Sequence, residues 1–387
     1  MKKVYADHGA TSFPKAPGVS DAIKDFLDNR GCNVNRGGYA ESYDVAMDIL
    51  DARQALADLF HTKSPQEVIF TPGVTYSLNM LLGGFLKKGD HVITTSMEHN
   101  AVMRPLHALS KKGVACDIVP CGRDGSLNAP DIVPFIKRET KAVVMLHASN
   151  VCGTILPIEA VSEICAERGL RLIVDAAQTA GVLDIDARGI DALAFPGHKG
   201  LLGPQGIGGF IVKKEFAGEI APLITGGTGS LSHELEQPEF LPDKFESGTL
   251  NIPGILGLKK AVEYLGATGI AAIYEREMEL TGAFLSRLRG IGGVKLVGGE
   301  DVAGRVAVVS LDFPGRDSAA IAAALDGDYG VMTRCGLHCA PVAHQTLGTY
   351  PHGTLRFSFG HFNTADEVEY IARAIKEILK KDTRYGF

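Results

Sequence analysis

The chain has 387 residues, of which 45% are hydrophobic and 22% charged, and its formal net charge is -6. Single cores stop growing at roughly 250–300 residues, so we expect one large domain and one smaller domain. The interspersed charges exclude a basic face for nucleic acid or anionic lipid, and no apolar run has the length of a membrane span or a signal peptide, which predicts a cytoplasmic protein.

Apolar runs and amphipathic stretches alternate from about residue 43 to residue 215. Helical spacing predicts helices over 43–60, 76–87 and 157–169, and short apolar runs predict strands over 67–70, 91–96, 141–149 and 171–177. This alternation is typical of βαβ units, so we predict an α/β fold with a mainly parallel sheet sandwiched by helices.

The rhythm changes after a Gly- and Pro-rich region over 226–253. Two long helical patterns, 252–269 and 271–291, precede strand candidates at 305–313 and 354–359 and a last helix, for which Thr364 and Glu367 form a capping box. We predict an N-terminal segment over 1–20, a large domain over 21–262 and a small domain over 263–387. The seven cysteines are scattered along the chain, which favours reduced thiols over a disulfide framework.

Two side chains at the ends of apolar runs suggest a cofactor. Asp175 ends the run RLIVD, where open α/β sheets place ligands, although such a residue more often caps a helix or holds a turn. Lys199, in GHKGLLGPQG, follows the next apolar run and lies 24 residues after Asp175. This is about the length of one βαβ crossover, so Asp175 and Lys199 can reach the same edge of the sheet. The pair suits pyridoxal phosphate: the lysine forms a Schiff base and the carboxylate keeps the pyridine nitrogen protonated.

Two further patterns suit the same cofactor. TPGVT places Gly73, Val74 and Thr75 between a strand and a helix, and a helix N-terminus attracts a phosphate. His99, in MEHNAV, follows the strand 91–96 and offers a flat ring that stacks on the cofactor. Taken singly, each pattern is weak, because a glycine turn before a helix is usually only a turn.

Seven motifs then occur in order and at suitable intervals: TPGVT, MEHNAV, HASNVCGT, VDAAQ, GHKGLLGPQGIG, FESGTLN and RCGLHCAP. Together they resemble the cysteine desulfurases and selenocysteine lyases, pyridoxal-phosphate enzymes with the class V aminotransferase fold. The resemblance runs from residue 5 to residue 368. It implies fold type I, a large domain that binds the cofactor, a small domain that carries the catalytic cysteine, and a first segment that packs near the active site.

The resemblance also implies a role for individual residues. The cofactor is implied to contact Gly73, Val74, Thr75, His99, Asn150, Asp175, Gln178, His198, Lys199 and Thr249. Within this set Lys199 is the Schiff-base lysine, Asp175 pairs with the pyridine nitrogen, and His99 stacks on the ring and takes part in proton transfer. Thr249 is implied to reach over from a partner subunit, so the resemblance implies a homodimer.

The substrate is implied to lie near Gly9, Asn150 and Arg356, with the Arg356 guanidinium binding its carboxylate. Cys339 is implied to be the nucleophile that takes sulfur from L-cysteine, which leaves L-alanine and an enzyme persulfide. L-selenocysteine is the alternative substrate, and a sulfur or selenium acceptor protein is a further partner. Attack needs a thiolate, which we expect the neighbouring Arg334 and His338 to favour.

Only 17 positions separate Cys339 from Arg356, which resembles the branch with a compact cysteine loop. Four residues depart from the family pattern: Pro196 replaces a phosphate-binding serine, His8 and Tyr39 stand near the substrate, and Cys335 adds a second thiol.

Two alternatives are open. A metal-binding module would use Cys335, His338, Cys339 and His344, but the cysteine spacing misses the usual two-residue gap, so no metal is predicted. A catalytically silent relative would bind the cofactor only, and the joint presence of Lys199, Asp175, Arg356 and Cys339 argues against it.

Overall fold

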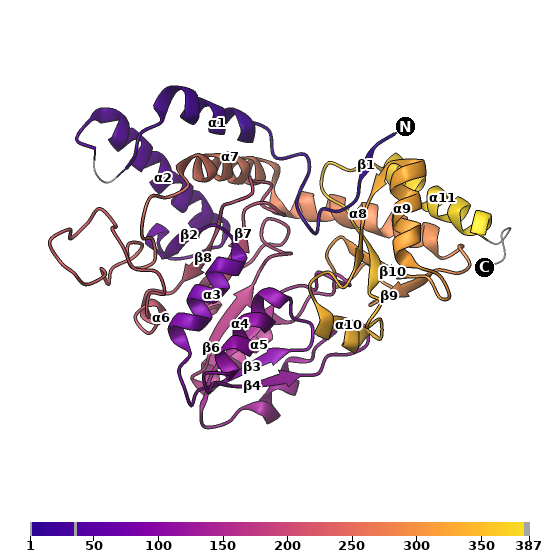
Figure 1. Ribbon diagram of the computed structural model, residues 1–387, viewed down its shortest axis with the longest axis horizontal. Coiled ribbons are helices and arrows are strands. Elements are labelled where there is room, and N and C mark those ends of the chain that lie inside the picture. The colour runs from indigo at the N-terminus through magenta and orange to yellow at the C-terminus, as the bar shows by residue number, and fades with distance from the viewer. Residues whose placement is uncertain (1, 35–36, 383–387) are drawn as a thin grey trace.

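Two sheets of different size organise the chain (Figure 1). The computed structural model describes residues 2–34 and 37–382. The larger sheet has the strand order β2-β8-β7-β6-β5-β3-β4, the smaller has the order β12-β13-β10-β9, and β1 pairs with β11. The strands are β1 (Val4–Tyr5), β2 (Val68–Thr71), β3 (His91–Thr95), β4 (Ala115–Val119), β5 (Thr140–Leu146), β6 (Arg171–Asp175), β7 (Ala192–Pro196), β8 (Gly208–Val212), β9 (Lys295–Val297), β10 (Val308–Asp312), β11 (Val331–Met332), β12 (Arg334–Gly336) and β13 (Thr354–Ser358).

Helices cover both faces of the larger sheet (Figure 1). The α-helices of the described residues are α1 (Val19–Asp25), α2 (Ala40–Leu59), α3 (Val74–Phe85), α4 (Asn100–Ser110), α5 (Ile158–Arg168), α6 (Lys214–Ala217), α7 (Ile252–Thr268), α8 (Ile270–Leu288), α9 (Ser318–Tyr329), α10 (Pro341–Leu347) and α11 (Ala365–Asp382). One apolar core joins α2, α5 and α7 to one face of the sheet, and a second joins α3, α4 and α6 to the other.

The run of five apolar residues that ends strand β5, AVVML, is explained by burial on both faces of the sheet. Val143 and Met145 belong to the first core, whereas Ala142 and Val144 belong to the second, so successive side chains alternate between two buried faces. The strands β4, β3, β5, β6 and β7 are parallel, and only β8 runs antiparallel to its neighbours in this sheet. The prediction of a mainly parallel sheet sandwiched by helices is therefore confirmed.

The C-terminal part has its own antiparallel sheet and its own core, formed with α8, α9 and α11. The predicted capping box is present: the Glu367 amide donates to Thr364 Oγ1 at 3.2 Å, and the Thr364 amide donates to Glu367 Oε2 at 3.0 Å. The predicted boundary after residue 262 lies inside α7, and the helical path breaks at Gly269 between α7 and α8. The division into domains stays a prediction.

The N-terminal segment joins the two parts of the molecule. Val4 pairs with Val331 of β11, and the Gly9 amide donates to Ser358 Oγ at the end of β13. On the other side, the Ser12 amide donates to the His198 carbonyl beyond β7 of the larger sheet. Across residues 2–34 and 37–382, no helix combines the length and apolarity needed to cross a bilayer.

Candidate active site

The candidate active site lies where the parallel strands of the larger sheet end. Asp175 is the last residue of β6, and Lys199 follows the end of the adjacent β7 by three positions. A cavity at this edge of the sheet is lined by Val74, His99, Leu146, Ala148, Asn150, Asp175, Ala177, Gln178 and Lys199. Six of the residues predicted to contact the cofactor are thus brought together, from segments that are up to 125 positions apart (74 to 199).

Lys199 and Asp175 form the charged pair of this cavity. Burial lowers the pKa of the Lys199 ammonium to about 8, Asp175 opposes this shift, and the nearby Arg356 and Arg334 reinforce it. Burial raises the pKa of Asp175, although its carboxylate accepts a hydrogen bond from the Ala177 amide at 2.9 Å. A lysine that loses its proton readily is suited to nucleophilic attack, and a buried carboxylate is suited to a cationic partner.

His99 is held in one neutral form. It is the N-cap of α4, and its Nδ1 accepts a hydrogen bond from the Ala101 amide at 3.0 Å. Because a backbone amide only donates, the proton of the neutral ring resides on Nε2. Burial, with the charges of Lys199 and nearby arginines, lowers the pKa of His99 to about 4. The ring is therefore uncharged at neutral pH.

Three of the predicted phosphate-binding residues, Gly73, Val74 and Thr75, form the start of α3. Gly73 has φ +154°, a backbone conformation that favours glycine, and its carbonyl accepts hydrogen bonds from the Tyr76 and Ser77 amides, whereas the Val74 and Thr75 amides precede the first helical hydrogen bond. His198, beside Lys199, contacts Thr11 Oγ1 through Nδ1 at 3.1 Å, and burial lowers its pKa to about 4. These features fit an anion held by neutral donors and backbone amides.

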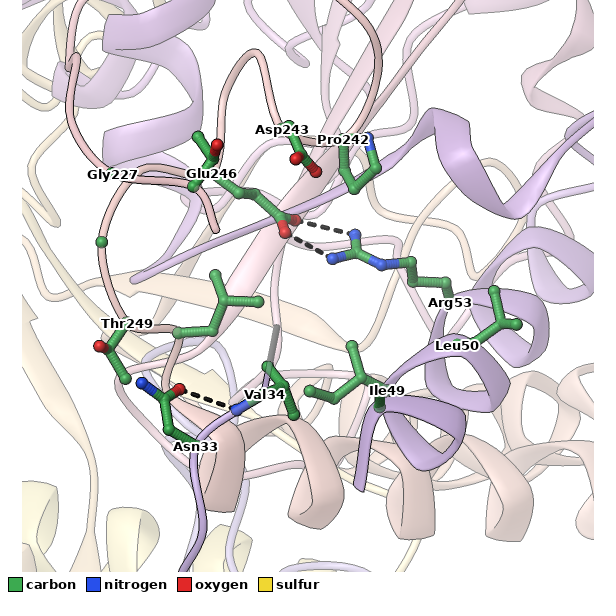
Figure 2. Close-up of a pocket in the computed structure, with 14 residues that line it drawn as sticks. Asn33, Val34, Ile49, Leu50, Arg53, Gly227, Pro242, Asp243, Glu246 and Thr249 are labelled. Atoms are coloured by element: carbon green, nitrogen blue, oxygen red, sulfur yellow. Dashed lines mark hydrogen bonds and ion pairs between the residues drawn. The ribbon is translucent and has the colours of Figure 1, made fainter. Parts of the chain in front are cut away.

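Thr249 does not line the Lys199 cavity. It lines one pocket together with Pro72 and Tyr76, which flank the predicted phosphate residues at the start of α3. It also lines a pocket beside α2 in which Arg53 and Glu246 form a buried two-pronged ion pair, with 2.8 Å between Arg53 Nη1 and Glu246 Oε1 (Figure 2). Within one subunit, Thr249 shares neither of these pockets with another of the predicted cofactor residues.

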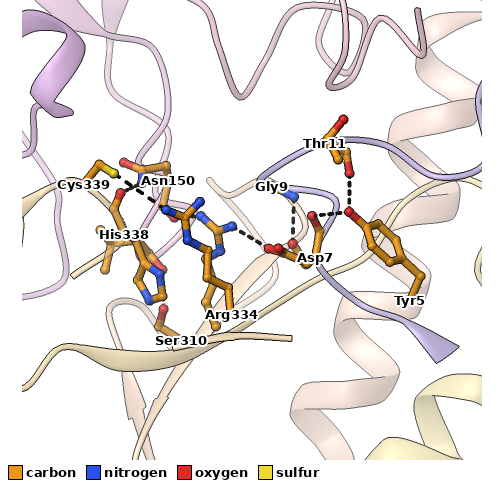
Figure 3. A network of polar contacts seen from close by, with 12 residues as sticks. Tyr5, Asp7, Gly9, Thr11, Asn150, Ser310, Arg334, His338 and Cys339 are labelled. Atoms are coloured by element: carbon orange, nitrogen blue, oxygen red, sulfur yellow. Dashed lines mark hydrogen bonds and ion pairs between the residues drawn. The ribbon is translucent and has the colours of Figure 1, made fainter. Parts of the chain in front are cut away.

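Arg356, the predicted substrate-binding arginine, lies in β13 with only 1% of its surface exposed. Its Nη1 donates to the Asn150 carbonyl at 3.0 Å and its Nη2 to Asp7 Oδ1 at 2.7 Å (Figure 3). A β-carbon added at Gly9 would lie 3.2 Å from Arg356 Cζ, so a larger residue there would crowd the guanidinium. Gln178 Nε2 donates to the Gly9 carbonyl at 3.1 Å, which ties this region to the Lys199 cavity.

Cys339 is exposed, and its backbone is held from two sides (Figure 3). Asn150 Nδ2 donates to the His338 carbonyl at 2.8 Å, and the Asn100 amide donates to the Cys339 carbonyl at 2.7 Å. Arg334 Nη2 donates to Cys339 Sγ at 3.6 Å, a charge-assisted contact with the sulfur. The predicted nucleophile therefore adjoins Asn150 of the cofactor cavity.

The expectation that His338 favours the Cys339 thiolate is wrong. Its side chain is buried, and its Nε2 pairs with Thr354 Oγ1 at 3.0 Å. Burial, reinforced by Arg356 and other nearby groups, lowers the pKa of His338 to about 2, so the ring carries no positive charge at neutral pH. Of the two neighbours expected to favour the thiolate, only Arg334 lies in contact with the sulfur.

The structure gives no support to a metal module. Within the part of the chain that the structure describes, no three His, Cys, Asp or Glu side chains are grouped to hold a metal ion. His344, one of the four ligands considered, pairs through Nδ1 with Thr349 Oγ1 at 2.6 Å. Cys335 is exposed on β12, the edge strand of the smaller sheet.

The other three residues that depart from the family pattern lie in different parts of the structure. His8 is buried, and its ring leaves room only for glycine at position 360, where a β-carbon would lie 2.3 Å from His8 Nδ1. Pro196 is buried at the end of β7, and Tyr39 precedes α2 with 48% of its surface exposed.

Sequence reasoning missed two carboxylates. Asp7 accepts a hydrogen bond from Arg356, and the only sign of it in the sequence is its position directly after the apolar run VYA. Glu98 precedes His99, and its Oε1 accepts hydrogen bonds from Thr95 Oγ1 at 2.6 Å and from the Leu146 amide at 3.1 Å. It thus links the ends of β3 and β5, and burial raises its pKa to about 8.

Comparisons with known proteins agree with this geometry. Residues 4–371 match the aminotransferase class-V family. A probable cysteine desulfurase of Methanothermobacter thermautotrophicus is 31% identical over 97% of this chain and 94% of its own length, and one of Halobacterium salinarum is 34% identical over 97% and 91%. The apo structure of a cysteine desulfurase from Thermococcus onnurineus superposes with a TM-score of 0.92 at 32% identity, covering 98% of this chain and 95% of that one. The cysteine desulfurase CsdA of Escherichia coli gives 0.87 at 28% identity, with 98% and 95% covered. The chain therefore belongs to the class-V aminotransferase family, among relatives named as cysteine desulfurases.

Proposed function

We propose that this protein is a pyridoxal-phosphate-dependent cysteine desulfurase, which converts L-cysteine to L-alanine and leaves a persulfide on Cys339. One observation carries the proposal: Lys199 and Asp175 share a cavity with Asn150, whose side chain bonds the backbone beside Cys339. This arrangement supports a site that combines a cofactor-binding lysine with a reactive thiol. Relatives named as cysteine desulfurases, matched over nearly the whole chain, support the same activity.

The cavity residues fit pyridoxal phosphate. Asn150 Oδ1 is buried without a hydrogen-bond partner, which suits a donor on a ligand, and the buried Asp175 suits a protonated ring nitrogen. Gly73, Val74 and Thr75 at the start of α3, with His198, would hold the phosphate. When bound through Lys199, the cofactor supplies an electron sink for the substrate carbons.

The protein's own groups bind the substrate and accept its sulfur. Arg356 binds the carboxylate and so fixes the orientation of the amino acid. The Cys339 thiolate attacks the substrate sulfur: a new S–S bond forms, the substrate C–S bond breaks, and its electron pair stays on carbon, which takes up a proton to give alanine. His99, neutral with its proton on Nε2 and its Nδ1 engaged by the Ala101 amide, is positioned in the same cavity to donate a hydrogen bond or a proton through Nε2.

The proposed enzyme is a homodimer in which Thr249 completes the phosphate site of the partner subunit. Two features support this arrangement. Thr249 lines a pocket separate from the Lys199 cavity, and the adjoining helix α2 exposes Tyr43, Met47 and Leu50 at helical spacing. Sedimentation analysis of the wild type, together with loss of cofactor affinity in Thr249→Ala, would support the shared site; a monomer that retains full activity would refute it.

Absorption spectroscopy and product analysis test the activity. Protein incubated with pyridoxal phosphate and then desalted should keep a visible absorption band that is absent in Lys199→Ala, and it should release alanine from L-cysteine. Cys339→Ala should lose that turnover. A colourless protein, or normal cysteine turnover in Cys339→Ala, would refute the proposal. Turnover of L-selenocysteine alone in Cys339→Ala would instead identify a selenocysteine lyase.

A further inference from the structure

Asn150 occupies a junction between three parts of the site. Its backbone carbonyl accepts a hydrogen bond from Arg356 Nη1 at 3.0 Å, and its Nδ2 donates to the His338 carbonyl at 2.8 Å. The side chain also lines the cavity that contains Lys199, where Oδ1 has no partner. With 6% of its surface exposed, the residue is held inside the protein rather than at its surface.

The backbone that Asn150 holds is strained. His338 and Cys339 have φ +47° and +58°, so two consecutive residues with side chains adopt the left-handed conformation. Each β-carbon makes this conformation unfavourable, and the pair persists only where surrounding contacts hold it. Two hydrogen bonds hold the carbonyls of this pair: the Asn150 side chain donates to the His338 carbonyl, and the Asn100 amide donates to the Cys339 carbonyl.

A third contact fixes the His338 ring. Its Nε2 pairs with Thr354 Oγ1 at 3.0 Å, Thr354 Oγ1 donates to Ser310 Oγ at 3.0 Å, and Ser310 Oγ donates to the Val151 carbonyl at 2.6 Å. This chain of hydrogen bonds ends one residue after Asn150. The segment around 150–151 therefore supports the cysteine loop both through its backbone and through its side chain.

We propose that Asn150 is a positioning residue for the nucleophile: its side-chain amide holds the strained His338–Cys339 pair, which keeps the Cys339 sulfur beside Arg334 next to the cofactor cavity. The inference rests on the proposed function for the role of Cys339 and extends it. Without the amide donor, the pair relaxes toward ordinary backbone conformations and the sulfur leaves the guanidinium that favours its thiolate form.

The reactivity of Cys339 toward iodoacetamide tests this role without requiring turnover. Alkylation of the holoenzyme is followed by mass spectrometry, and fragmentation distinguishes Cys339 from Cys335, whose rate serves as an internal control. Asn150→Asp keeps the size and an acceptor oxygen but removes the donor to the His338 carbonyl. Loss of one buried hydrogen bond should slow Cys339 alkylation roughly five-fold, while Cys335 keeps its rate.

A matched variant separates the cofactor contact from the loop contact. Gln178 lines the same cavity, but its amide donates to the Gly9 carbonyl instead of the cysteine loop, so Gln178→Glu should leave Cys339 alkylation unchanged. Thr354→Val, which removes the contact to His338 Nε2, should slow Cys339 alkylation and preserve the cofactor absorption band. Unchanged alkylation in Asn150→Asp, or an equal change in Gln178→Glu, would overturn the inference. Failure of the proposed function would appear separately, as a missing cofactor band or missing alanine.

Discussion

The pKa of Lys199 provides the sharpest quantitative test of the site. In the cofactor-free protein, burial lowers this pKa to about 8 from the ordinary 10.5. At pH 7 the reactive free amine would then amount to about 9% of the lysine, against about 0.03% for an ordinary lysine, a gain of roughly 300-fold. Uptake of pyridoxal phosphate should therefore accelerate with pH and level off above about pH 8.

Two substitutions should move this pKa in opposite directions. Asp175 raises the pKa of Lys199 and Arg356 lowers it, so Asp175→Asn should shift the midpoint down and Arg356→Gln should shift it up. Competitive labelling of Lys199 with acetic anhydride over pH 6–11, read by mass spectrometry against surface lysines, measures the midpoint without depending on cofactor affinity. A midpoint above pH 10 in the wild type, or shifts of the same sign in both variants, would refute the electrostatic reasoning.

Three further predictions concern the carboxylates and Arg356. Arg356→Lys should raise KM for L-cysteine about ten-fold with a smaller change in kcat, because an ammonium cannot bind a carboxylate with two prongs; steady-state kinetics measures the split, and an unchanged KM would place the substrate carboxylate elsewhere. Asp7→Asn should lower the free energy of unfolding by about 2–3 kcal/mol, since Arg356 is 1% exposed and loses its anionic partner, whose side chain is 18% exposed; urea unfolding checks this, and stability equal to wild type would contradict it. Glu98→Gln should change the pH dependence of stability. Burial raises the pKa of Glu98 from 4.5 to about 8, so its contribution to stability is fully present below pH 4.5 and is lost progressively as pH rises to 8. The Tm of Glu98→Gln should therefore gain on wild type between about pH 5 and pH 8; curves that stay parallel over this range would argue against a buried protonated acid.

Much of the larger sheet could be predicted because its signals are local. The inner parallel strand β5 is buried on both faces over Ala142–Leu146, so the run AVVML is apolar throughout and its position is evident from the sequence, whereas the edge strand β4 is partly exposed and lacks this signal. The capping box before α11 is equally local, since its two side chains are three residues apart. By contrast, β1 and β11 have two residues each and are defined only by their pairing with one another, more than 320 positions apart. A local sequence pattern cannot predict such a pairing.

The site was predictable as a set of residues but not as a geometry. The ion pair of Arg356 with Asp7 joins residues 349 positions apart, and the sequence around either gives no sign of the other. The His338 ring faces Thr354, 16 positions later, so its neutral, buried state depends on folding of the smaller sheet. Left-handed backbone at His338 and Cys339 is likewise imposed by surrounding contacts, because neither residue favours it.

The pairing of the first residues with the last sheet has a consequence for biosynthesis. Val4 can pair with β11 only after Val331 has been synthesised, and the Gly9 amide can form its hydrogen bond only after Ser358 has been synthesised. At about 5–20 residues per second, a ribosome needs roughly 16–70 s to make the intervening chain. Throughout that interval residues 4–9 lack these partners, and Arg356 has not yet been made. A nascent chain can thus build its central sheet early, but this part of the enzyme becomes complete only after residues 331–358 have been synthesised.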